Sequence, residues 1–214
     1  MEPMIEIRNL EKSFCGEILF QDISLDIRRG EIVGFTGENG CGKSVLFKMI
    51  CGLISADKGT IRVLGTRVTD GKFPGSIGIM LDGTGFIPYY TGFQNLKNIA
   101  VIDRKISDQK IQESMALVGL DYKSRKPVKK YSLGMKQRLG LAMALMEDPE
   151  LLLLDEPMNA LDKDMVCKIR TLLMQLNREK RVTVLITSHN ERDIELLCTQ
   201  VYEISGHRLK KIRG

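Results

Sequence analysis

The stretch EIVGFTGENGCGKSVLFKMI, residues 31–50, determines the fold of this chain. Glu31–Thr36 is a short apolar run typical of a buried strand, and Val45–Ile50 has the spacing of a helix. The residues between them are rich in glycine, which allows the backbone to turn tightly. A strand, a glycine-rich loop and a helix in this order predict an α/β unit that binds a nucleotide.

The loop between strand and helix matches a phosphate-binding pattern in full. Its glycines allow backbone N–H groups to turn toward phosphate oxygens, and the helix directs its positive end at them. We expect Lys43 to reach the β- and γ-phosphates and the Ser44 hydroxyl to hold Mg²⁺. A chance glycine-rich turn is the alternative, and the flanking strand and helix disfavour it. The predicted nucleotide contacts are Gly37, Glu38, Asn39, Gly40, Cys41, Gly42, Lys43 and Ser44.

Length and composition limit the class of protein. The 214 residues suffice for one compact α/β domain with a small inserted subdomain. With 43% apolar and 28% charged residues, the chain is of a globular rather than a disordered type. Its longest apolar runs are too short to cross a bilayer, and no secretion signal is visible. We therefore expect a cytoplasmic protein that docks onto a spanning partner if it acts at a membrane.

The net charge of +5 does not indicate nucleic-acid binding. Basic residues are densest between Lys123 and Arg138, where Tyr122 and Tyr131 are the aromatic neighbours. Stacking on bases has little support there, and a solvated face near anionic headgroups or ATP explains the charge as well. The five cysteines are odd in number and lack the close spacing of a zinc site. We expect reduced, mostly structural thiols, with Cys41 in the loop as a reactive exception when ATP is absent.

The rest of the chain falls into three parts. The first third alternates apolar runs with glycine-containing turns, the middle has helical spacing, and the last third returns to strands and helices. This order predicts a three-layer fold with its ligand at the carboxyl ends of the strands. The predicted strands are Ile5–Leu10, Ile18–Ile27, Thr60–Leu64, Leu151–Leu154, Val182–Thr187, Tyr202–Ser205 and Arg208–Ile212, and the predicted helices are Asn95–Ile102, Ser107–Val118, Ser132–Met146 and Asp162–Asn177.

Two further segments carry candidate chemistry. Asp155 and Glu156 follow the apolar run Leu151–Leu154, so Asp155 can bind the Mg²⁺ shell and Glu156 can act on the attacking water as general base. A strand ending in solvent is the alternative, which the upstream loop disfavours. Ser132 and Gly134 begin a predicted helix, whose positive end is a second candidate anion contact. Taken alone, that segment favours a simple serine cap.

In this order, the segments resemble the nucleotide-binding subunits of ABC transporters over essentially the whole chain. The resemblance implies an α/β P-loop NTPase (RecA-like) fold. Its three-layer core, with an N-terminal antiparallel β-subdomain, would comprise residues 1–82 and 149–214, and a helical subdomain would occupy 83–148. The matching segments are Gly37–Ser44, Ser132-Leu133-Gly134-Met135 at the signature position, Asp155-Glu156-Pro157, Asn159-Ala160-Leu161-Asp162 at the D-loop and His189 at the switch position.

In that family two subunits pair head to tail around ATP and Mg²⁺. The resemblance implies that Ser132 and Gly134 contact the γ-phosphate of the ATP held by the partner. It implies that His189 senses the same phosphate, where a surface turn histidine is the alternative. Asp162 would link the two sites or simply cap its helix. Phe14 lies where the family has an aromatic that stacks on adenine, and a place in the core is equally open.

The chain departs from the family pattern in two places. In the signature, Leu133 replaces a glycine and Met135 replaces a glutamine. Asp82 stands where the family has the Q-loop glutamine, and it remains a candidate Mg²⁺ ligand, directly or through water. Both departures resemble the branch that includes bacitracin-resistance and lantibiotic-immunity exporters.

The expected function is that of an ATP-hydrolysing subunit of an ABC exporter, with Glu156 as the base. The expected partners are an integral membrane permease and a second ATP-binding subunit, on the inner face of the cell membrane. A non-transport ABC ATPase that acts on ribosomes or nucleic acid is the alternative. It is disfavoured because the chain holds one such domain and has no room for long coiled coils. The sequence does not indicate the cargo.

Overall fold

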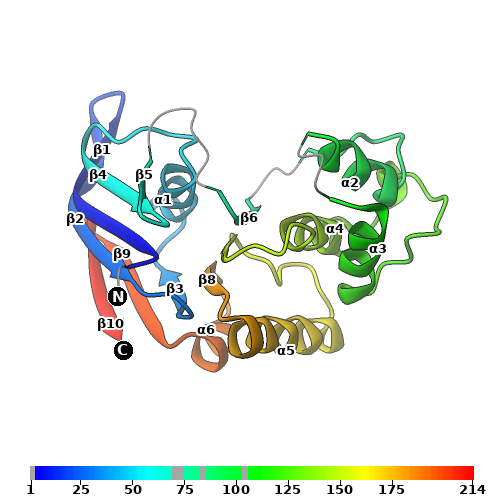
Figure 1. The fold of residues 1–214 in the computed structure, drawn as a ribbon. Helices are drawn as coiled ribbons and strands as arrows, with labels where there is room; N and C mark the ends of the chain where they lie inside the picture. Colours follow the sequence, from blue (N-terminus) through cyan, green and yellow to red (C-terminus); the bar gives the residue numbers. More distant parts are fainter. Residues whose placement is uncertain (1–2, 69–74, 82–84, 103–105) are drawn as a thin grey trace.

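The computed structural model describes residues 3–68, 75–81, 85–102 and 106–214, so the predicted ligand Asp82 lies outside the described residues. The described residues form two sheets and several helices (Figure 1). In chain order the elements are β1 Ile5–Phe14, β2 Glu17–Ile27, β3 Ile32–Thr36, α1 Lys43–Ile50, β4 Lys58–Val63, β5 Thr66–Arg67, β6 Ile77–Met80, α2 Gly92–Ala100, α3 Asp108–Leu117, the 3-10 turn η1 Val128–Lys130, α4 Leu133–Leu145, β7 Leu151–Leu154, α5 Lys163–Lys180, β8 Thr183–Thr187, α6 Glu191–Leu197, β9 Gln200–Ser205 and β10 Arg208–Arg213.

The larger sheet has the strand order β10-β9-β3-β8-β7-β6. Its strands β6, β7, β8, β3 and β9 pair in parallel, and β10 closes the sheet as an antiparallel hairpin with β9. Side chains of β7 alternate between two cores: Leu151 and Leu153 pack on one side, Leu152 and Leu154 on the other. A strand covered on both faces must be apolar throughout, which explains the four consecutive leucines.

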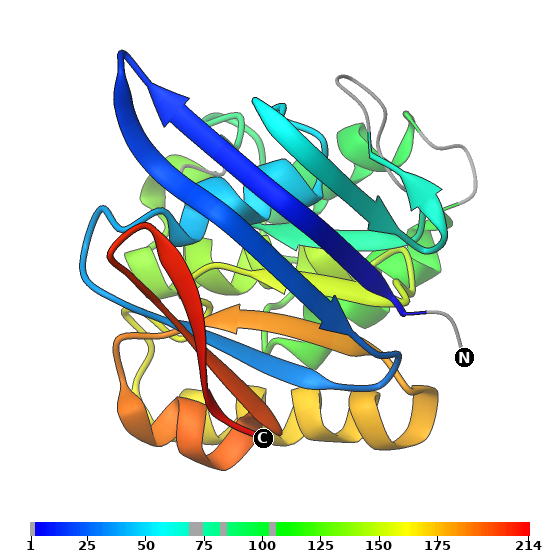
Figure 2. The same ribbon diagram turned by 90° about the vertical axis from the view of Figure 1, so that its left-hand side faces the viewer.

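The smaller sheet is antiparallel, with the order β2-β1-β4-β5. Its long strands β1 and β2 are at the front of Figure 2, with the β9–β10 hairpin beside them. Buried residues of α1 share one core with this sheet and with one face of the larger sheet. Helix α1 therefore lies between the two sheets, and the predicted antiparallel N-terminal part is confirmed.

Helices α2, α3 and α4 lie between β6 and β7 in the chain and stand apart from the smaller sheet in Figure 1. Thr91 and Gln94 form a capping box at α2, and the Ser107 side chain caps α3. Each such cap contributes about 1 kcal/mol, because it satisfies an N–H without a partner in the helix. The predicted helices in this stretch are confirmed, with ends shifted by a few residues.

In the last third of the chain, one helix was predicted from the sequence and another was not. Helix α5 buries Ile169 and Leu173 on one face, as its spacing predicts. Helix α6 is an element that the periodicity did not predict, because its seven residues are too few to show a helical pattern.

Among the described residues, no helix has the length and apolar character that crossing a membrane requires.

The cysteines are all free thiols. Burial raises the pKa of both Cys51 and Cys198 to about 12, which makes them inert at neutral pH. Cys15 and Cys167 are exposed, so the expected structural role fits only part of the set.

Candidate nucleotide-binding and catalytic site

The site lies where three neighbouring strands end. Strands β3, β8 and β7 pair in parallel, so their carboxyl ends meet at one edge of the sheet. The glycine-rich loop follows β3, the acidic pair follows β7, and His189 follows β8. Residues far apart in the sequence therefore share one cavity of about 270 Å³. It is lined by Asn39, Gly40, Gly42, Lys43, Ser44, Val45, Asp155, Glu156 and His189.

Two loop positions require glycine. Gly37 has φ 139° and Gly42 has φ 107°, a region that side chains disfavour. A Cβ at Gly37 would lie 2.6 Å from the Ile204 carbonyl oxygen, and one at Gly42 would lie 2.6 Å from Phe20 Cζ. The loop can therefore wrap tightly over the start of α1 only because both side chains are absent.

Lys43 extends back over the loop that precedes it. Its Nζ donates to the Gly37 carbonyl at 2.7 Å and to the Glu38 carbonyl at 3.0 Å. Cys41 Sγ lies 3.8 Å from the same ammonium. These contacts hold the ammonium inside the loop, beside the N-terminus of α1. The positive charge and the helix N-terminus both attract anions.

Asp155 is almost fully buried, with 4% of its surface exposed. Its Oδ1 accepts a hydrogen bond of 2.6 Å from the Thr187 hydroxyl. Its Oδ2 is buried and has no hydrogen-bond partner among the described residues. A buried carboxylate oxygen without a partner is costly, and a bound cation is one way to satisfy it.

Glu156 is held mainly through its backbone. It has φ 50°, its N–H donates to Thr187 Oγ1 at 2.9 Å, and its carbonyl accepts from Gln137 Nε2 at 2.5 Å. Its Oε2 accepts from the His189 backbone N–H at 3.2 Å. His189 Nε2 lies 3.4 Å from Oε1, but the alignment does not make a hydrogen bond. Oε1 thus remains a buried acceptor without a hydrogen-bond partner in the part of the chain described.

Burial raises the pKa of Glu156 above the ordinary value of a glutamate. The His189 N–H and the charges of His189 and Lys43 act in the opposite direction, and the charge of Asp155 adds to the rise. A raised pKa makes the carboxylate a stronger proton acceptor. Because a base must be deprotonated to act, any activity of Glu156 as a base would be lost as the pH falls through this raised pKa.

Residues 20–159 match the family model described as ABC transporter. The chain belongs to the ABC transporter family. The uncharacterized ABC transporter ATP-binding protein YybJ of Bacillus subtilis (strain 168) is 38% identical over 208 residues, 97% of this chain and 95% of that protein. The bacitracin transport ATP-binding protein BcrA of Enterococcus faecalis is 35% identical over 215 residues, 99% of this chain and 70% of that protein.

The fold is that of other ABC cassettes. The dimeric structure of MJ0796, a bacterial ABC transporter cassette, superposes with a TM-score of 0.88 at 24% identity and covers 99% of this chain and 100% of that one. The predicted P-loop NTPase fold is therefore confirmed. Family membership makes the chain an ATP-binding ABC subunit, an ATPase whose hydrolysis is coupled to transport. The similarity to BcrA agrees with the predicted branch.

The ABC signature residues lie away from the cavity around Lys43. Ser132 caps α4, and its hydroxyl accepts from the Met135 N–H at 3.2 Å, as the simple capping alternative predicts. Leu133, which replaces a signature glycine, is 65% exposed. Neither Ser132 nor Gly134 lines the cavity that holds Glu156. Their role toward ATP remains a prediction.

Replacing Gly134 with alanine is expected to lower the free energy of unfolding by about 1–3 kcal/mol, the usual cost of overpacking. The added Cβ would lie 2.7 Å from the Ala160 carbonyl oxygen, a backbone atom that cannot rotate away. Urea unfolding measures the change. Gly140→Ala in the same helix is the control, because its nearest neighbour would be Met80 at 3.6 Å. A loss equal to the control's would contradict the steric argument.

Phe14 and Asp162 each had two possible roles. Phe14 is 45% exposed at the end of β1, with Lys12 Nζ 5.0 Å from its ring centroid. The core alternative is therefore wrong, and adenine stacking remains a prediction. Asp162 caps α5, since its Oδ1 accepts from the Met165 N–H at 2.8 Å. Its link to a second active site stays a prediction.

Two residues of the site were missed by sequence reasoning. Thr187 is fully buried, donates to Asp155 and accepts from the Glu156 N–H, so one hydroxyl fixes both acids. Gln137 joins α4 to the Glu156 carbonyl. A threonine at the end of a buried strand was the only signal for the first, since such a polar group requires partners.

Proposed function

We propose that this chain is the motor subunit of an ABC exporter for an antimicrobial peptide or a similar drug. One observation carries the ATP-hydrolysing part of the proposal: Asp155 Oδ2 and Glu156 Oε1 are buried acceptors without hydrogen-bond partners among the described residues, at the sheet edge that holds Lys43. The Asp155 oxygen suits a metal ion, and the Glu156 oxygen suits the proton of a water molecule. The similarity to a bacitracin transport protein supports the exporter branch.

The residues at this edge fit MgATP. Lys43 and the loop amides would bind the β- and γ-phosphates, and Ser44 with Asp155 would hold Mg²⁺. Asp82 remains a proposed further ligand. The metal would neutralise charge that develops on the transferred phosphoryl group. The orphaned oxygen of Asp155 is the feature that favours a cation here.

Glu156 accepts a proton from the attacking water in this mechanism, and His189 contacts the γ-phosphate beside it. Phe14, exposed at the end of β1, stacks on adenine. Ser132 and Gly134 lie outside the cavity of their own chain, which supports their delivery by a second copy. Closure of two copies around ATP would then complete each site, and hydrolysis would release it.

The proposed assembly is a pair of ATP-binding subunits on a membrane-spanning permease, at the cytoplasmic face. Within each subunit, residues 1–82 and 149–214 form the core and residues 83–148 form the helical subdomain. In support of this division, helices α2, α3 and α4 follow one another between β6 and β7.

Co-purification from native membranes tests the assembly. A tagged Glu156→Gln variant with MgATP should recover an integral membrane protein, because a chain that binds but does not hydrolyse ATP stays in the closed complex. The Lys43→Ala/Glu156→Gln double variant is the control and should recover less of it, since closure needs ATP. Recovery of ribosomes or DNA without a membrane protein would overturn the transporter proposal and leave the ATPase.

A further inference from the structure

Asp193 is a buried carboxylate outside the nucleotide cavity. It lies in the first turn of α6 and is 2% exposed. Its Oδ1 accepts from Arg170 Nε at 2.8 Å and also from Arg170 Nη2, while its Oδ2 accepts from the Ser188 hydroxyl at 3.0 Å. Both arginine N–H groups converge on Oδ1, so Oδ2 is left to accept from Ser188.

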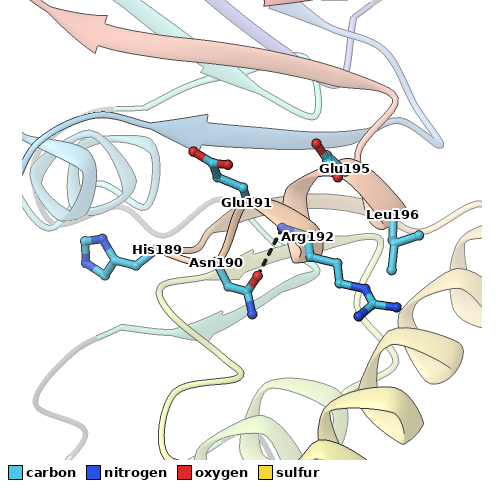
Figure 3. Close-up of a pocket in the computed structure, with 6 residues that line it drawn as sticks. All are labelled: His189, Asn190, Glu191, Arg192, Glu195 and Leu196. Atoms are coloured by element: carbon cyan, nitrogen blue, oxygen red, sulfur yellow. Dashed lines mark hydrogen bonds between the residues drawn. The ribbon is translucent and has the colours of Figure 1, made fainter.

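These bonds fix the loop on both sides of His189. Ser188 Oγ donates to Asp193 and accepts from the Asn190 N–H at 3.1 Å. Asn190 in turn caps α6 through the Arg192 N–H at 3.0 Å. Figure 3 shows this cap as a dashed line, with the His189 ring apart from the side chains of α6. The loop therefore has little freedom although its histidine is exposed.

The fixed loop acts directly on Glu156. The His189 backbone N–H donates to Glu156 Oε2 at 3.2 Å, and the ring nitrogen Nε2 lies 3.4 Å from Oε1. A cavity of about 610 Å³ is bordered by Glu156, Arg170, Ser188, His189 and Asp193 together. The ion pair is thus part of the wall of a cavity that Glu156 also borders, and no residue of the glycine-rich loop is among the lining residues of that cavity.

A buried ion pair is a poor way to join two helices for stability alone. Well-packed apolar residues of similar volume often hold such a contact equally well, because taking charges out of water is costly. What the ion pair adds is a fixed direction for the second carboxylate oxygen, the one that holds Ser188.

We propose that Asp193, oriented by Arg170, is a positioning residue for ATP hydrolysis that acts through Ser188 to hold His189 against Glu156. The inference rests on the proposed role of Glu156. Ser188 is the decisive link, because its hydroxyl can be removed while the Arg170–Asp193 ion pair remains.

Steady-state hydrolysis at saturating ATP, compared with the affinity for a non-hydrolysable ATP analogue, tests this link. Ser188→Ala should lower kcat by about 10- to 100-fold, the cost of a small displacement of a catalytic group, and leave the affinity and the unfolding midpoint unchanged. Ser188→Thr, which keeps the hydroxyl, should recover most of kcat. Ser114→Ala is the control, since it removes a buried hydroxyl that bonds the Ile111 carbonyl far from the site.

A double-mutant cycle completes the test. Asp193→Asn should lower kcat, and adding Ser188→Ala should cause little further loss. Both changes break the same series of contacts, which runs from Asp193 through Ser188 to His189. Full kcat in Ser188→Ala would overturn the inference even if Asp193→Asn fails to fold. So would independent, multiplying losses in the cycle. A Glu156→Gln variant with wild-type turnover would instead refute the proposed base, so the two failures are distinguishable.

Discussion

Replacing Glu156 with glutamine is expected to lower kcat for ATP hydrolysis by about 100- to 10,000-fold, the usual contribution of a general base. ATP affinity should not change. The backbone bonds of Glu156 to Thr187 and Gln137 do not involve the side chain, so they persist in the variant. The amide has nearly the same shape as the carboxylate but cannot take a proton from water at neutral pH.

Phosphate release at saturating MgATP measures kcat, and calorimetric titration with a non-hydrolysable analogue measures affinity. Glu179→Gln provides the matched control, because it makes the same chemical change on α5, where the Glu179 side chain accepts from Gln175 at 3.1 Å. Turnover near the wild-type rate would exclude Glu156 as the base. A loss in Glu179→Gln of the same size would mean that the effect is not local.

Removing the Lys43 ammonium has the second large expected effect, on binding rather than on the chemical step. A charge-assisted hydrogen bond contributes about 1.5–3 kcal/mol, so Lys43→Ala should weaken ATP binding about 10- to 100-fold. The stability of the fold should change little, because the contacts of the ammonium within the described part of the chain are to carbonyls of its own loop and to the Cys41 sulfur.

Lys48→Ala is the matched control for that change. Lys48 lies in the last turn of the same helix, and like Lys43 it is half-buried. Calorimetric titration should find its ATP affinity unchanged. Equal affinities of Lys43→Ala and the wild type would show that the phosphates bind elsewhere. Equal losses in both variants would point to helix α1 as a whole.

Local sequence patterns were sufficient to predict most of the strands and helices. Leu151–Leu154 predicts a strand buried on both faces because an all-apolar run of four has no solvent side, and every one of its side chains is buried. Helix α6 could not be predicted in this way, since its seven residues present only Ile194 and Leu197 as buried apolar positions. The Ser132 cap is local in sequence, so it could be recognised there.

The residues of the site also divide into those that local sequence predicts and those that it does not. The glycine-rich loop and the acidic pair are contiguous in the sequence and could be recognised there. Thr187 and Gln137 could not, because their partners lie 32 and 19 residues away in the chain. Phe14 shows a third kind of limit: a lone aromatic has no periodicity, and only its 45% exposure excludes the core.

The order of strands in the larger sheet also affects when the nucleotide site can form during synthesis of the chain. β8 lies between β3 and β7, yet it is translated after both of them. A nascent chain that ends within α5 already has the loop and the acidic pair, but the strand that joins them is still missing. Since chains emerge at about 5–20 residues per second and fold from the N-terminus, we expect nucleotide binding on the ribosome to wait until β8 has been made. A chain truncated within α5 therefore has the glycine-rich loop and the acidic pair but lacks β8 and His189.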